Sequence, residues 1–221
     1  MRTVWALVGQ SLAYIDLSQP APENWELRLT PAGLAALRDE EYNPDDPAGY
    51  LARLLADLPD LGSIERAYVQ EALGAYTARL YIACTVMLGT ASEAVCLALM
   101  RSFAGTLDSQ EKETFRALLD DPRRSYSRKF TEFRKKLEAR RSKLPSDHLD
   151  GLDLSLNSVL ELLRVNRNDA GHPTGKTFDR GDCFVSLRMA ARLFRKIFAL
   201  KNYFETEPPA VCSADAAPDG P

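Results

Sequence analysis

The sequence predicts a mainly α-helical bundle that carries a small N-terminal β-hairpin and helix. From residue 48 onward, apolar residues recur at helical spacing in one segment after another. Residues 80–103 are apolar on nearly all sides, which is typical of a helix in the middle of a bundle. The first forty residues instead contain a stretch that alternates with period two next to a Pro-rich turn. With 221 residues, 45% of them hydrophobic, the chain can bury a sizeable core.

Three consecutive parts follow from these patterns. Residues 1–42 form a hairpin-plus-helix segment, with strands in 7–17 and 25–29 and a helix over 31–38 that begins at Thr30-Pro31. This order resembles part of a winged-helix module, although it is too short to hold a whole one. Residues 48–204 form the helical bundle. Residues 205–221 are rich in Pro, Ala and Asp and are predicted to be disordered.

Inside the bundle, helix starts and breaks follow capping and proline signals. A break at 43–47 precedes the first helix, Ser63 caps the second, and Asp121-Pro122 separates two polar helices. The predicted helices span residues 48–58, 63–76, 80–103, 109–120, 125–143, 149–165 and 183–204.

Charge is distributed unevenly along the chain, whose formal net charge is −3. Residues 1–122 sum to −9, whereas residues 123–143 sum to +8. A basic segment of that density can attract a polyanion even on an acidic protein. The candidate contacts to an RNA backbone are Arg123, Arg124, Arg128 and Lys129.

The aromatic residues of the same basic segment favour a structural interpretation. Phe130, Phe133 and Leu137 recur at helical spacing, so we expect them to face the core while the cations cover a solvated face. The basic side chains remain candidates for a substrate groove.

Cysteine usage and hydropathy indicate the cellular compartment. Cys84, Cys96, Cys183 and Cys212 are widely spaced and form no CxxC pair, so neither a metal site nor a disulfide framework is predicted. Free thiols in apolar helices fit a reducing cytoplasm. No uninterrupted apolar stretch reaches about eighteen residues, so we expect no membrane partner.

The most informative motif is RNDAGHP, residues 167–173. Arg167 and His172 stand five positions apart at the end of a predicted helix, and Gly171 with Pro173 predicts that His172 lies just beyond it. An arginine holds a phosphate through paired donors, and a histidine exchanges a proton near pH 7. Together they suit metal-free cleavage of RNA, in which a base removes the 2′-hydroxyl proton and that oxygen attacks the adjacent phosphorus.

The run RNDAGH resembles the R-x4-6-H signature of HEPN domains, and the likeness extends over roughly residues 48–204. It implies a metal-independent endoribonuclease without a cofactor, in which two copies of the motif form one composite site in a homodimer. By this resemblance Arg167 binds and polarises the phosphate, and His172 acts as general base or acid. Asn168 positions the motif, and Glu93, in the central helix, is a supporting partner of Arg167.

The resemblance also implies a biological setting and leaves alternatives open. Many members act as toxins or in antiviral defence, so an antitoxin or regulatory protein is an expected partner. Members silenced by adenylylation carry a tyrosine where this chain has Thr174, so that route of control is not expected. The alternative function is an inactive scaffold that binds RNA, nucleotide or a partner protein. In the plainest alternative, Arg167 and His172 only cap the helix end and pair with Asp169. A separate possibility gives the N-terminal hairpin and helix a role in DNA binding or partner docking.

Overall fold

The computed structural model describes residues 13–16, 26–30, 42–149, 152, 156, 160–173 and 175–206. The chain divides into two compact units, Met1–Glu41 and Tyr42–Pro221. In the first unit, strands β1 (Ala13–Asp16) and β2 (Glu26–Leu29) pair antiparallel, so the predicted hairpin is confirmed. The predicted helix at 31–38 and residues 207–221 of the predicted tail lie outside the described residues.

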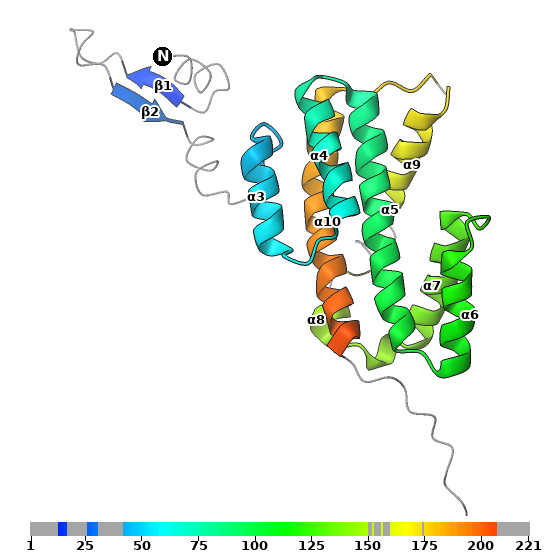
Figure 1. Cartoon of the computed structure of the whole chain (residues 1–221). Coiled ribbons are helices and arrows are strands. Elements are labelled where there is room, and N and C mark those ends of the chain that lie inside the picture. The colour runs from blue at the N-terminus through cyan, green and yellow to red at the C-terminus, as the bar shows by residue number, and fades with distance from the viewer. Residues whose placement is uncertain are drawn as a thin grey trace, which may run out of the picture. The chain divides into compact units, whose positions relative to one another are not determined.

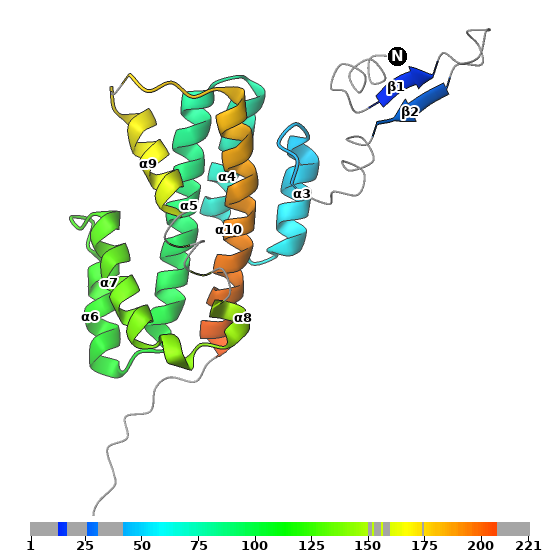
Figure 2. The same cartoon turned by 180° about the vertical axis from the view of Figure 1, so that it is seen from behind.

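The second unit contains the helical bundle, so the predicted fold class is confirmed. The helices described in it are α3 (Pro47–Asp57), α4 (Ser63–Thr77), α5 (Tyr81–Gly105), α6 (Ser109–Asp120), α7 (Tyr126–Ala139), the 3-10 helix η2 (Arg141–Lys143), α8 (Ser146–Leu149), α9 (Leu160–Gly171) and α10 (Arg180–Thr206). Helix α5 is central, with α4 and α10 on one side and α9 and the α6–α7 hairpin on the other (Figures 1 and 2).

Side-chain caps define where several helices begin. The Asp46 carboxylate accepts from the Gly49 amide at 3.1 Å at the start of α3, and Pro47 occupies the first helical position. At the start of α6 the Asp108 carboxylate accepts from the Glu111 amide at 2.9 Å. These starts match the predicted ones closely because short polar caps and prolines are local signals.

The predicted helix over residues 149–165 is wrong at its C-terminal bound, because α9 begins at Leu160 and continues to Gly171. Leu152 and Leu156, the described residues between α8 and α9, are also helical. The described leucines from 152 to 163 are mostly buried: Leu152, Leu156, Leu160 and Leu163. Helix α9 runs past residue 165 because nothing interrupts it before Gly171 and Pro173.

Helix α5 is long and apolar enough to cross a membrane, with a mean hydropathy of 1.8 over an 18-residue window. Its apolar residues are interrupted by Ser92-Glu93, so the sequence has no uninterrupted apolar run of that length there. Half of that window is buried inside the bundle, and the central helix of a bundle has the same composition as a membrane span.

The core follows α5 along its length. Near its C-terminal end, the Phe103 ring meets the rings of Phe115, Phe133 and Phe204 edge-on, at centroid distances of 6.2, 5.3 and 5.1 Å. These four residues, the aromatic cluster, join α5, α6, α7 and α10. Phe130, Phe133 and Leu137 are buried, as their spacing predicts.

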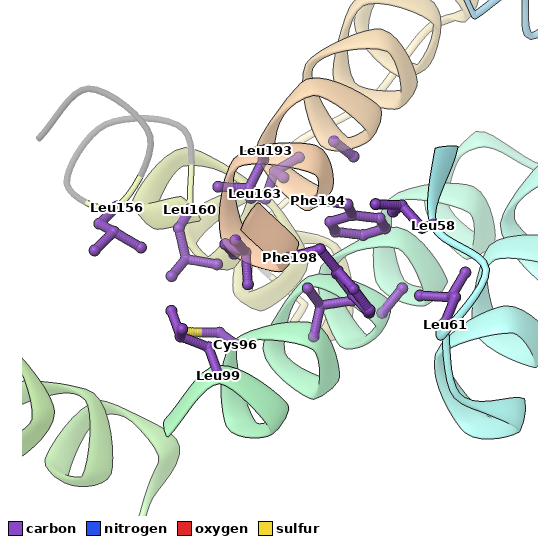
Figure 3. Close-up of a cluster of buried hydrophobic side chains, with 14 of the residues drawn as sticks. Leu58, Leu61, Cys96, Leu99, Leu156, Leu160, Leu163, Leu193, Phe194 and Phe198 are labelled. Atoms are coloured by element: carbon purple, nitrogen blue, oxygen red, sulfur yellow. The ribbon is translucent and has the colours of Figure 1, made fainter. Parts of the chain in front are cut away.

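Leucine and phenylalanine side chains from α9 and α10 continue the core beyond this cluster. Leu160 and Leu163 of α9 gather with Leu193 of α10 and with Cys96 and Leu99 of α5 (Figure 3). The apolar face of α9 is therefore fixed against both long helices, and its remaining faces are free to carry polar groups.

Candidate functional site

A glycine of the central helix lets α9 approach closely. A Cβ placed on Gly89 would lie 2.3 Å from the Arg167 Cβ and 3.1 Å from the Leu163 carbonyl oxygen. Any larger residue at position 89 would push α9 outward. Because the contact involves the Arg167 stem itself, Gly89 sets where the Arg167 side chain leaves its helix.

The structure brings Arg167 and Glu93 together. The Arg167 guanidinium donates to a Glu93 carboxylate oxygen across the α5–α9 contact, and the two side chains are 31% and 14% exposed. The Arg167 Nε is buried and has no hydrogen-bond partner among the described residues. Gly89, Glu93 and Arg167 together are named the Arg167 junction. The Arg167 guanidinium is held by one carboxylate and is still partly exposed, so it has donors left with which it can meet a phosphate.

His172 lies in the turn that follows α9, so it stands just beyond the helix end, as Gly171 and Pro173 predict. Its side chain is exposed, and among the described residues it makes no hydrogen bond to Arg167. Asn168 is half-buried, and its side chain forms no hydrogen bond with a described residue. Within one chain, the histidine is therefore presented outward from the helix end while the arginine is held against α5.

Asp169 is engaged by a residue that the sequence did not single out. The Lys176 ammonium donates to the Asp169 carboxylate at 2.9 Å and to the Asn166 side-chain oxygen at 3.1 Å. It also lies over the Phe178 ring, 5.2 Å from the centroid. Lys176 thus ties the segment after the turn back to α9. Arg167 has Glu93 as its carboxylate partner, which differs from the plain helix-end pairing with Asp169.

Two further ionisable groups border the junction. Burial raises the pKa of Tyr126 well above its usual range and the pKa of the Cys96 thiol to about 12. The Tyr126 hydroxyl has this thiol as its polar neighbour, without the geometry of a regular hydrogen bond. Both groups stay neutral at pH 7, so neither is a nucleophile or a base for the junction.

The predicted backbone-contacting cations divide into two kinds. Arg123 and Arg124 pair with Asp121 at 3.2 and 3.6 Å and are well exposed. The Lys129 ammonium instead donates to the Leu119 carbonyl oxygen at 2.6 Å, so it caps the C-terminal end of α6.

Arg128 belongs to the exposed kind and pairs with Glu132 at 3.7 Å. With Arg124 it lines a small cavity of about 260 Å³ between α6 and α7. Three of the four predicted cations are therefore available to an anion, whereas Lys129 is occupied within the fold.

Comparison with known proteins adds no family to this geometry: no family model matches the chain, and no curated protein or solved structure is significantly similar to it. Among the described residues, no three His, Cys, Asp or Glu side chains gather in a group that could hold a metal ion. The arrangement itself can bind an oxyanion at Arg167 and offers a proton-exchanging imidazole at the same helix end.

Proposed function

We propose that this protein is a metal-independent endoribonuclease of the HEPN type, active as a homodimer in the cytoplasm and serving as a toxin or defence effector. The observation that carries the proposal is the Arg167–Glu93 pair at the end of α9, with an exposed His172 in the turn that follows. An anchored but accessible guanidinium and an outward-facing imidazole on one helix end are the two groups that RNA cleavage by the 2′-hydroxyl needs.

The proposed chemistry assigns one role to each group. A neutral His172 imidazole removes the 2′-hydroxyl proton, and the 2′-oxygen attacks the adjacent phosphorus. The P–O5′ bond breaks, the leaving oxygen takes a proton, and a 2′,3′-cyclic phosphate remains. Arg167 stabilises the charge on the phosphate oxygens, and Glu93 keeps its guanidinium oriented. Two chains bring two imidazoles to one composite site, so one can act as base and the other as acid.

The test is cleavage of a mixed RNA pool in EDTA by the wild type and by His172→Ala and Arg167→Ala. We expect cyclic-phosphate products from the wild type and a loss of at least about 100-fold in both variants. His148→Ala is the matched control, because His148 is the other histidine of the chain and packs 4.9 Å from the Tyr203 ring, away from α9. Equal loss in all three variants, or activity that EDTA removes, would reject the proposed mechanism.

The second candidate function is an inactive scaffold that binds RNA, nucleotide or a partner protein. The observation in its favour is that His172 makes no hydrogen bond with any described residue, so none of these residues orients its ring through a hydrogen bond. A stable dimer without cleavage activity in any variant, combined with RNA binding that Arg167→Ala weakens, would favour this function over the enzyme.

A further inference from the structure

A second, larger cavity lies along α7 and reaches α9. Its volume is about 810 Å³, within the range of about 300–1,000 Å³ of small-ligand sites. Four cationic residues line it, three from α7 and η2 and one from α9: Arg134, Lys135, Arg141 and Arg164. Arg134, Lys135 and Arg141 belong to the basic segment that the sequence keeps as a candidate substrate groove, whereas Arg164 joins them through the fold of the chain.

Two cations of this α7 cavity, Arg134 and Lys135, are exposed. Among the described residues of its lining Glu138 is the acidic one, and it pairs with Arg141 at 3.4 Å. Lys135 pairs with Glu132 at 3.4 Å, and Lys135 is 68% exposed. Arg134 is exposed and forms no ion pair with a described residue. An anionic ligand would therefore gain charge-assisted contacts from Arg134 and Lys135, whose side chains are open to solvent.

The lining of the α7 cavity is apolar between these cations. Phe130, Leu137, Leu144 and Leu156 contribute side chains that otherwise belong to the core. Cationic side chains beside an apolar surface suit a single-stranded nucleic acid, because its phosphates meet the cations while its bases leave water. A duplex keeps its bases stacked inside and offers only its backbone.

The α7 cavity also leads to the Arg167 junction. Arg164 lines it and lies three residues before Arg167 on the same helix, so the two side chains emerge on neighbouring positions of one face. Resting on the proposed function, we infer that the α7 cavity binds a single-stranded RNA segment and directs the adjoining phosphate to Arg167.

The first test measures binding separately from cleavage. A fluorescein-labelled, single-stranded 2′-O-methyl RNA lacks the nucleophilic hydroxyl, so fluorescence anisotropy reports affinity alone. We expect Arg134→Ala/Lys135→Ala to weaken binding at least about tenfold at low salt. Loss of two phosphate contacts should also reduce the slope of the logarithm of the association constant against the logarithm of the salt concentration by about 1.4. Arg66→Ala/Arg116→Ala removes two exposed arginines elsewhere and is expected to retain wild-type affinity.

A pair of threonines gives a sharper control. Thr131 lines the α7 cavity and Thr77 lies in α4, and both are exposed threonines whose hydroxyls donate to the carbonyl four residues earlier at 2.9 Å. We expect Thr131→Glu to weaken RNA binding as strongly as loss of the two cations, and Thr77→Glu to leave it within twofold. Equal losses, or the reverse order, would overturn the assignment of this cavity.

The outcomes separate the inference from the proposed function. No binding of the 2′-O-methyl RNA, equal affinity for a duplex of the same sequence, or equal affinity for an acidic peptide of similar charge would overturn the inference. Binding by the wild type that the cavity variants weaken, without any cleavage of ordinary RNA, supports the inference and rejects the enzyme. Cleavage with an unchanged KM in Arg134→Ala/Lys135→Ala keeps the enzyme and rejects the cavity.

Discussion

The central helix makes two contacts of opposite character. Toward its C-terminal end, Phe103 is fully buried among three other rings of the aromatic cluster. In its N-terminal half, Gly89 lets the Arg167 stem and the Leu163 carbonyl of α9 come close, and this contact holds a partly exposed ion pair. The Arg167 Nε there has no hydrogen-bond partner in the described part of the chain. The first contact is built for stability, and the second positions a charged group that the fold does not fully satisfy.

The two contacts also differ in how much they contribute to stability, because one is apolar and buried and the other is charged and partly exposed. Full burial of a phenylalanine side chain stabilises the native state by about 1.5–3 kcal/mol, and the surrounding rings add to this. A partly exposed ion pair contributes about 0–1 kcal/mol. The Arg167 junction therefore depends on the rest of the bundle to hold its helices together, and substitutions in the two contacts should separate stability from activity.

The largest expected effect belongs to the aromatic cluster. Phe103→Ala leaves a cavity among four helices and should lower the free energy of unfolding by about 3–5 kcal/mol, measured by urea denaturation followed by circular dichroism. Ile82→Ala, on the same helix but 53% exposed, is the control and should change it by less than about 0.5 kcal/mol. If Phe103→Ala fails to fold, Phe103→Leu should give a smaller loss of unfolding free energy. A loss no larger than that of Ile82→Ala would mean that the aromatic cluster is not the more stabilising of the two contacts.

The aromatic cluster also shows what local sequence patterns reveal. The buried face of α7 follows from the spacing of Phe130, Phe133 and Leu137, and the helix starts follow from nearby caps and prolines. These features depend on residues a few positions apart. The segment over 149–165 ends at a different residue than its sequence predicts, yet its regularly spaced leucines Leu152, Leu156, Leu160 and Leu163 are buried.

The Arg167 junction is harder to predict because it is formed over long sequence separations. Arg167 and Glu93 were singled out through a family resemblance and stand together in the structure. The role of Gly89 could not be foreseen, since a glycine inside a helix has no periodic signal and its contact comes from a helix far along the chain. Arg164 joins the cations of the α7 segment over a similarly long separation, whereas Lys176 reaches Asp169 only seven residues back across the turn.

The intermediate effect tests the close approach of α9. In Gly89→Ala the new methyl group would overlap the Arg167 stem and press on the Leu163 carbonyl, so we expect a loss of about 1–3 kcal/mol in unfolding free energy. Gly74→Ala, inside α4, has open space around the new methyl group and should stabilise the protein by up to about 1 kcal/mol. Both values come from urea denaturation.

The two glycine variants also bear on the proposed enzyme. Because Gly89→Ala displaces the Arg167 stem, cleavage at a temperature where both variants are folded should fall in Gly89→Ala and stay unchanged in Gly74→Ala. Similar stability and similar cleavage in the two variants would mean that the Arg167 junction tolerates displacement of α9. The close approach at Gly89 would then have no role in positioning Arg167.

The smallest effect concerns Tyr126, which lies between the two regions. Its ring stacks on Phe130 at 6.0 Å, while its hydroxyl is buried without a regular hydrogen bond. Tyr50 is the matched control, because its hydroxyl is equally buried but donates to the Leu187 carbonyl at 2.8 Å. At pH 7 we expect Tyr126→Phe to change the unfolding free energy by less than about 0.5 kcal/mol and Tyr50→Phe to lower it by about 1 kcal/mol.

The pH dependence of these variants distinguishes burial from hydrogen bonding. Burial raises the pKa of both phenols above the unfolded value of about 10, so the stabilisation from keeping them neutral is complete below pH 10 and declines as pH rises further. Each Tyr→Phe variant should therefore lose less stability than the wild type between pH 10 and 11 in urea denaturation. Tyr126→Phe could instead show the same dependence of unfolding free energy on pH as the wild type, while Tyr50→Phe does not. That result would mean that water reaches the Tyr126 hydroxyl, and that the apolar core ends before this residue.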